Sequence, residues 1–269
     1  MVKKLFKHEF DAYKRFLLPV YLILLAVSVF TRILYFFETD TTVFRIISVS
    51  SIIALVVASV VCILLTFVNI ITRFYKNLFT NEGYLSFTLP VTTEQHIFVK
   101  LTVGVIAVIA SLVTVVIAVC IATAGEMTVE LFKVVGYFFK HVPPYFDGHF
   151  WFYFVEIILI MLLALVVSIL LYYSCIAIGQ LTRKNRVLAA VGVYFGYYMI
   201  EQVLGTVFII VFYALQDTDF YTTILKFMEK NSYEFIHIVL AISFVVYALL
   251  ALLFFFITNT VIKKKLNLE

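Results

Sequence analysis

The sequence predicts an all-α membrane protein with six transmembrane helices and with both termini in the cytoplasm. Three observations predict this fold class: the composition, the length of the apolar segments and the distribution of basic residues. Hydrophobic residues make up 64% of the 269 residues and charged residues only 13%, against about 45–50% and about 25% in ordinary soluble domains. So few charges cannot cover so much apolar surface in water. The composition therefore excludes a soluble enzyme domain, a disordered chain and a nucleic-acid-binding domain.

Six apolar segments are long enough to cross a bilayer, because a helix needs about 20 apolar residues to span the hydrocarbon. Helices are expected because every backbone N–H and C=O group in lipid must find its partner within its own segment. The alternating pattern of a membrane β-barrel, with segments of about ten residues, is absent. The predicted spans are 16–37, 46–71, 101–124, 150–178, 187–215 and 235–262.

The basic residues set the predicted orientation. Most of the 20 Lys and Arg residues fall in segments that six spans would place on the same side, namely 3–15, 73–100, 183–186 and 263–265. By the positive-inside rule, loops rich in Lys and Arg stay in the cytoplasm, so both termini are expected there. Two termini on the same side require an even number of spans. We expect a multi-pass membrane protein.

The predicted organisation is an amphipathic segment followed by one membrane domain. Residues 1–15 place apolar and basic side chains on different helix faces, which favours an interfacial helix with basic groups toward anionic lipid. The alternative is a helical extension of the first span. Residues 16–269 form a single six-helix domain with an internal loop at 73–100 and external loops at 125–149 and 216–234. The last of these has helical spacing of its apolar residues.

Two glutamates and two glycines within the predicted spans are candidates for a structural or functional role. Glu156 and Glu201 lie in apolar segments, where a charge costs about 2.5–3.5 kcal/mol on insertion scales. Each is expected to line a translocation path or to make a polar contact between helices. Gly192 and Gly196 have the G-x-x-x-G spacing of a helix-packing face, within one subunit or between two.

The sequence lacks the common catalytic and metal-binding motifs. It has no P-loop, no H-E-x-x-H and no G-x-S-x-G, so we expect no catalytic residue, no cofactor and no ATP hydrolysis in this chain. His141, Asp147 and His149 share one external loop, but loop histidines beside an acid are more often solvated than bound to metal. No metal site is expected.

The internal loop at 73–100 is the most informative segment. It is longer than the two to eight residues that usually join adjacent helices. A turn at 81–83 precedes an apolar and aromatic stretch at 84–89, and Pro90 then interrupts the chain. Thr92 or Thr93, followed by Glu and Gln, is typical of the start of a new helix. Apolar and aromatic side chains such as those at 84–89 are unfavourable in water, so a partner protein or lipid should cover them.

The order Glu82-Gly83-Tyr84-Leu85, then Leu89-Pro90-Val91, with Lys100 further on, resembles the E-G-Y-L…L-P-V loop of permease subunits of type-2 ABC exporters. This resemblance implies one half of a two-permease pore, completed by a second copy or a paralogue. It also implies a separate ATPase subunit, which binds ATP and Mg²⁺ and holds the loop. Substrates of such exporters include peptides, lipids, glycans and drugs. The residues expected to contact the ATPase are Glu82, Tyr84, Leu85, Phe87, Leu89 and Pro90, with Gly83 in a conformational role.

Two other classes of function remain open at this point. One is an intramembrane enzyme that uses Glu156, Glu201 or the loop histidines for acid–base chemistry. The other is a structural or sensory membrane protein that transports nothing. Convergence of polar residues at one depth would favour the enzyme.

Overall fold

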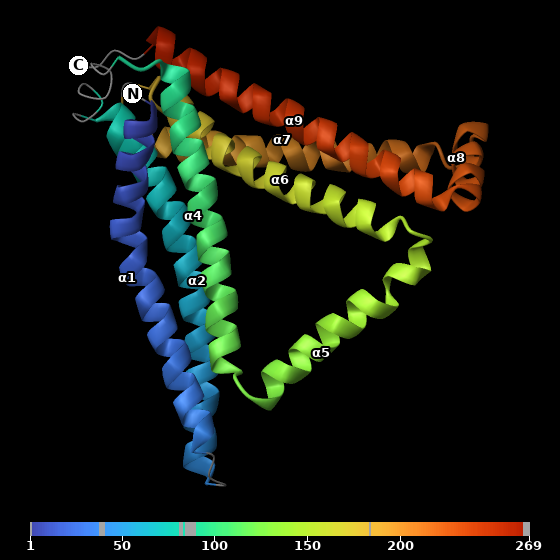
Figure 1. Ribbon diagram of the computed structural model, residues 1–269. Helices are drawn as coiled ribbons and strands as arrows, with labels where there is room; N and C mark the ends of the chain where they lie inside the picture. Colours follow the sequence, from blue (N-terminus) through green and yellow to red (C-terminus); the bar gives the residue numbers. More distant parts are fainter. Residues whose placement is uncertain (1, 38–40, 81–82, 84–89, 183, 266–269) are drawn as a thin grey trace. The chain divides into compact units, whose positions relative to one another are not determined.

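The computed structural model describes residues 2–265 apart from 38–40, 81–82, 84–89 and 183, and every regular element that it describes is helical (Figure 1). The chain forms two compact units, Met1–Lys140 (unit 1) and His141–Glu269 (unit 2). They are described in turn.

Six of the described helices are long and apolar enough to span a membrane, which confirms the predicted helical class with six spans and indicates a multi-pass membrane protein. The side of the membrane on which the termini lie stays a prediction. Their apolar side chains point largely outward, as expected of helices that are solvated by lipid. The six are α1 (Val2–Phe36), α2 (Thr42–Phe79), α4 (Thr93–Ala122), α6 (Phe150–Gly179), α7 (Arg186–Ala214) and α9 (Ser232–Lys265).

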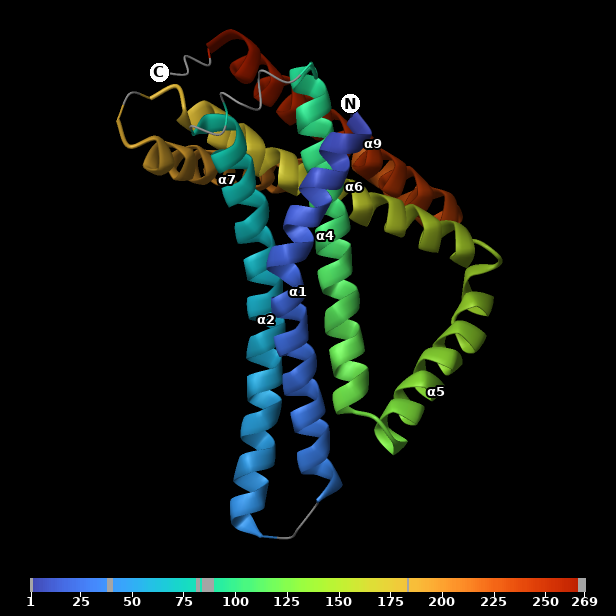
Figure 2. The ribbon, with the colours of Figure 1, turned by 60° about the vertical axis from the view of Figure 1, so that its left-hand side comes forward.

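In unit 1, α1, α2 and α4 pack side by side (Figures 1 and 2). Small and apolar side chains fill the centre of this bundle, among them Leu24, Cys62 and Ala118. Hydroxyl groups join the three helices: the Ser111 hydroxyl lies 2.8 Å from that of Tyr21 and 2.7 Å from that of Thr66. Such contacts stabilise helix association where the surroundings offer no water.

The first helix is continuous from Val2, so the segment predicted at 1–15 belongs to the same helix as the first span. Glu9, Tyr13 and Leu17 are buried at intervals of four residues, and this spacing keeps one helix face against α2 and α4. Pro19 lies within the helix without ending it. The position of residues 1–15 at the membrane surface stays a prediction.

In unit 2, α6 packs against both α7 and α9. Gly179, at the end of α6, allows the closest approach. A Cβ atom there would lie 2.8 Å from the Cβ of Ala190 and from the carbonyl oxygen of Arg186, both on α7. Asn185, with φ of 54°, turns the chain into α7 in the left-handed region. Further along the same pair of helices, the rings of Tyr172 and Tyr194 stack at 5.7 Å.

Both predicted external loops contain helices. The first holds α5 (Glu126–His141) and the short 3₁₀ helix η1 (Pro143–Phe146), and the second holds α8 (Asp219–Lys230). α8 packs against α9, and the Thr218 hydroxyl accepts a hydrogen bond from the backbone N–H of Tyr221, which caps its first turn. The apolar spacing at 216–234 therefore correctly predicted a helix.

Candidate functional site

The segment between α2 and α4 is the predicted coupling element. The structure narrows the non-helical part of the predicted loop, because α2 continues to Phe79 and α4 begins at Thr93. Gly83 and Pro90 are described. The other residues that were assigned to ATPase contact, namely Glu82, Tyr84, Leu85, Phe87 and Leu89, lie outside the described residues.

Gly83 lies where no side chain would fit. It is buried, and its backbone N–H donates to the carbonyl oxygen of Thr80 at 2.7 Å. A Cβ atom would lie 2.6 Å from the carbonyl oxygen of Leu78, a contact that real Cβ atoms do not make. Pro90, by contrast, is exposed.

The first turn of α4 is fixed by a capping box at Thr92, one of the two predicted N-caps. The Thr92 hydroxyl accepts from the backbone N–H of Gln95 at 3.4 Å. In return, the Gln95 side-chain oxygen accepts from the backbone N–H of Thr92 at 3.2 Å. Two N–H groups that the helix cannot satisfy are thereby bonded, and the chain enters α4 in a defined direction.

Beside this segment, Glu9 of α1 accepts hydrogen bonds from both flanking helices. From α2, Arg73 donates through Nη2 at 2.8 Å, and Asn77 donates at 3.0 Å. From α4, the Lys100 ammonium lies 2.5 Å from Oε1 of Glu9, the carboxylate oxygen that also accepts from Asn77. The Arg73 guanidinium also lies over the ring of Tyr13, 5.3 Å from its centre. We call Glu9, Arg73, Asn77 and Lys100 the Glu9 cluster.

Burial makes the Glu9 cluster energetically important. Glu9 is 2% exposed and Lys100 is 3% exposed, so each charge has lost most of its contact with water. A buried charge is tolerated only when it is paired and hydrogen-bonded, and Glu9 supplies the negative charge for two cations. The cluster thereby joins α1 to the helix end before segment 80–92 and to the helix start after it.

Sequence reasoning missed the Glu9 cluster. The available indication was that Arg73 and Lys100 border apolar segments, where a basic side chain needs a counter-charge. Their partner is 64 and 91 positions away along the chain. The order of residues does not reveal such a pairing, because only the packing of three helices brings it about.

A second polar group lies in unit 2 and involves Glu156, one of the predicted residues. The Nδ1 atom of His237 lies 2.9 Å from both carboxylate oxygens of Glu156, so this carboxylate joins α6 to α9. The Nε2 atom of His237 lies 3.0 Å from Nδ1 of His149. The ring of Tyr153 covers His237, with the ring centres 4.4 Å apart.

The three residues Glu156, His237 and His149 form a hydrogen-bonded chain from carboxylate to imidazole to imidazole. A carboxylate fixes the tautomer and the orientation of the histidine that it contacts. His149 therefore pairs across to α9, although the sequence grouped it with His141 and Asp147. Within the part of the chain that the structure describes, no group of three or more His, Cys, Asp or Glu residues could hold a metal ion.

The remaining predicted residues lie on α7. Glu201 is exposed on this helix. A Cβ atom built on Gly192 or on Gly196 meets no heavy atom within 4 Å among the described residues. The G-x-x-x-G face is therefore not a packing face within unit 2, and the alternative of contact between subunits stays a prediction.

Comparison with known proteins found no matching family model, no matching curated protein and no matching solved structure.

Proposed function

We propose that this chain is the membrane-spanning permease subunit of an ATP-driven transporter of the type-2 ABC exporter group. The observation that carries the proposal is the sequence Glu82-Gly83-Tyr84-Leu85 to Leu89-Pro90-Val91 between two apolar spans. Six apolar helices support it, since a permease must cross the bilayer. The resemblance implies that the protein lies in the bacterial cytoplasmic membrane, and the basic residues indicate that both termini are inside.

In this proposal, ATP is hydrolysed by a separate subunit that grips segment 80–92. ATP and Mg²⁺ bind to that partner, and a second permease copy or a paralogue completes the pore. The exported substrate is a peptide, a lipid or a drug-like molecule, as in the exporters that the loop resembles.

The Glu9 cluster supports the mechanical part of the proposal. Coupling requires that a displacement of the gripped segment reach the spans as a rigid-body movement. Because Glu9 bonds to Arg73 before the segment and to Lys100 after it, the two helix ends cannot separate without breaking a buried ion pair. The capping box at Thr92 stiffens the exit from the segment in the same way. Force applied at the segment would thus move α1, α2 and α4 together.

The experiment is co-purification from the native membrane. The tagged chain, extracted in mild detergent, is expected to retain an ATPase that mass spectrometry identifies. Replacing Leu85 and Leu89 with Asp should uncouple ATP hydrolysis from export, because two charges would enter an apolar contact. The matched control replaces the same two residues with Met, which keeps volume and apolar character and should preserve coupling.

The proposal is overturned if the Asp double variant inserts normally, binds its ATPase and exports as the wild type does. The proposal also fails if no ATPase co-purifies with the chain although thermal unfolding shows that the purified chain is folded.

A second candidate is an intramembrane enzyme, and the contact of Glu156 with His237 favours it. A histidine oriented by a carboxylate can act as a general base. Glu201 is not part of this group: within the described residues, no hydrogen bond or ion pair joins it to Glu156. The replacement Glu156→Gln distinguishes the candidates, because export should survive it whereas an acid–base reaction should lose turnover.

A further inference from the structure

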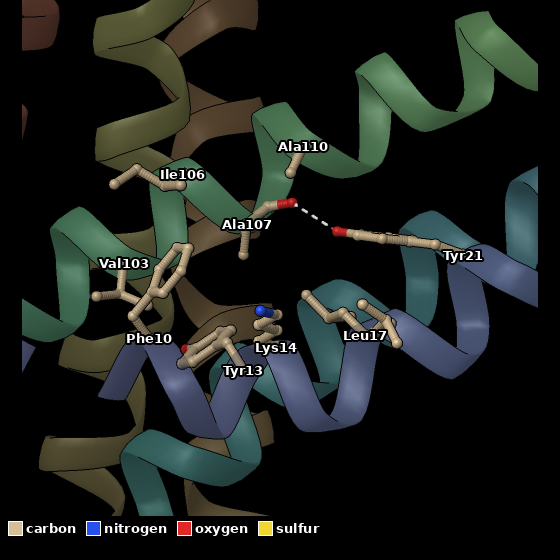
Figure 3. A pocket seen from close by; sticks show the side chains of 10 residues that line it. Phe10, Tyr13, Lys14, Leu17, Tyr21, Val103, Ile106, Ala107 and Ala110 are labelled. Atoms are coloured by element: carbon tan, nitrogen blue, oxygen red, sulfur yellow. Dashed lines mark hydrogen bonds between the residues drawn. The ribbon is translucent and has the colours of Figure 1, made fainter. Parts of the chain in front are cut away.

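A hollow between α1 and α4 in unit 1 is lined almost entirely by apolar side chains (Figure 3). Its volume is about 150 Å³, which matches a cavity that takes up benzene in an apolar protein interior. Leu17 of α1 and Val103 of α4 form part of its buried wall. Ala107 and Ala110 of α4 leave the space open, because their side chains are small.

The lining offers hydrocarbon contacts rather than free polar groups. The only hydroxyl groups on its wall belong to tyrosines, and that of Tyr21 is already bonded within unit 1. It donates to the carbonyl oxygen of Ala107 at 3.3 Å (Figure 3). It also lies 2.8 Å from the Ser111 hydroxyl. The lining therefore suits an apolar chain.

One charged side chain lines the hollow, that of Lys14 (Figure 3). It is exposed, and Lys7 lies two helical turns before it on the same face of α1. Two acidic residues are near in sequence. Glu9 is bound to Arg73 and Lys100. Asp11, which is exposed, is therefore the remaining acidic residue among the basic residues of 3–15.

Lys14 also marks the boundary between charged and apolar sequence in α1. Charged residues are frequent up to residue 15, and the apolar segment follows from Phe16. The α1 residues that line the hollow extend from Phe10 to Tyr21, a length of about 16 Å at 1.5 Å per residue. A positive charge beside an elongated apolar space is the complement of a phosphate group joined to an acyl chain.

We propose that this hollow binds one anionic phospholipid of the bilayer, with an acyl chain against Ala107 and Ala110 and the phosphate on Lys14. Basic pockets between transmembrane helices hold anionic headgroups in this way. The proposal requires only that the chain lies in a membrane. Its test therefore succeeds or fails separately from that of the ATPase contact.

The test counts lipids on the purified chain. The protein is placed in micelles that contain equal amounts of phosphatidylglycerol and phosphatidylcholine, and native mass spectrometry measures which lipid is retained. The wild type is expected to retain phosphatidylglycerol preferentially. Lys14→Gln should weaken this retention about fivefold, the effect of one basic residue near an anionic lipid surface. Lys4→Gln removes the same charge outside the hollow and should leave retention unchanged.

Filling the hollow is the second arm. Ala110→Leu should abolish the retained lipid, whereas Ala54→Leu, at an exposed position on α2, should not. Both variants are compared by thermal unfolding. In parallel, a phosphatidylglycerol with a photoactivatable acyl chain is cross-linked to the wild type, and the label is expected in peptides that contain Phe10–Tyr21 or Val103–Ala110.

Three results would overturn the proposal. The first is equal retention of the two lipids by the wild type. The second is a Lys4→Gln variant that loses as much as Lys14→Gln. The third is a photochemical label that is found in neither peptide. Because this label is measured on the wild type, it tests the proposal even if Ala110→Leu does not fold.

Discussion

The carboxylate of Glu9 accepts hydrogen bonds from three side chains that belong to two other helices. Its Oε2 atom bonds to Arg73, and its Oε1 atom bonds to Asn77 and Lys100. A neutral amide in its place would keep the shape but would remove the negative charge from two cations. Removing one partner of a buried ion pair is strongly destabilising, because the opposite charge loses its compensation.

We therefore expect Glu9→Gln to lower the free energy of unfolding of unit 1 by about 3–5 kcal/mol, the usual cost of breaking a buried pair. Thermal unfolding of the purified protein in detergent measures this loss. Asp11→Asn is the matched control, since it removes the same charge two residues away from an exposed position. An equal response of the two variants would contradict the assigned role of the Glu9 cluster.

Among the candidate residues, the ones that could be predicted were those marked by an anomaly of their own. Glu156 is anomalous because it interrupts an apolar segment, and it does meet a polar partner. That partner, His237, is 81 positions away, and no local pattern links the two positions. Glu9 stood among other charged residues near the chain start, so nothing local distinguished it from its solvated neighbours.

At the scale of helices, the two glycines of unit 2 offer a direct comparison. At Gly179, a methyl group would collide with Ala190 and with the backbone of Arg186. At Gly192, a methyl group would meet open space. The first position brings α6 and α7 into close contact, and the second meets no other described element of unit 2.

Gly179→Ala is expected to destabilise unit 2 by about 1–3 kcal/mol, because overpacking forces the backbones apart. Gly192→Ala should be neutral or stabilising by about 0.5–1 kcal/mol, because alanine restricts the unfolded chain and suits a helix interior. Thermal unfolding of both variants checks the contrast. A loss of stability at Gly192 would instead indicate that another chain packs against α7 there.

The helices themselves were largely predictable, because the length of an apolar run decides whether it spans a bilayer. Their ends were not. α1 and α2 continue past their apolar segments, since residues such as Glu9 and Arg73 satisfy their charges within the bundle and do not require an end to the helix. α5 lies in a segment that was expected to be a loop.

At the scale of the molecule, six spans would place the two ends of the sequence on one side of the membrane, and the basic residues predict that this side is the cytoplasm. We expect a membrane-impermeant maleimide to label Asp217→Cys in intact cells. Lys4→Cys and Lys264→Cys should be labelled only after permeabilisation, because the basic ends lie inside. The native cysteines Cys62, Cys120 and Cys175 are first replaced by Ala to remove the background.

Labelling of Lys4→Cys and Lys264→Cys from opposite sides would require an odd number of crossings. It would remove the orientation on which the assignment of segment 80–92 to the cytoplasm depends. Labelling of both from outside would keep six crossings but invert them.

The contact between Glu9 and Lys100 also constrains how the protein is made. Lys100 is 91 positions after Glu9, so the ribosome adds it roughly 5–20 s later at ordinary rates of synthesis. During that interval, the beginning of the nascent chain has no ammonium group from the third membrane helix to bind. The contact of Glu9 with α4 therefore forms only after that helix has been synthesised, and a halt in translation between Asn77 and Lys100 would leave Glu9 with its α2 partners alone.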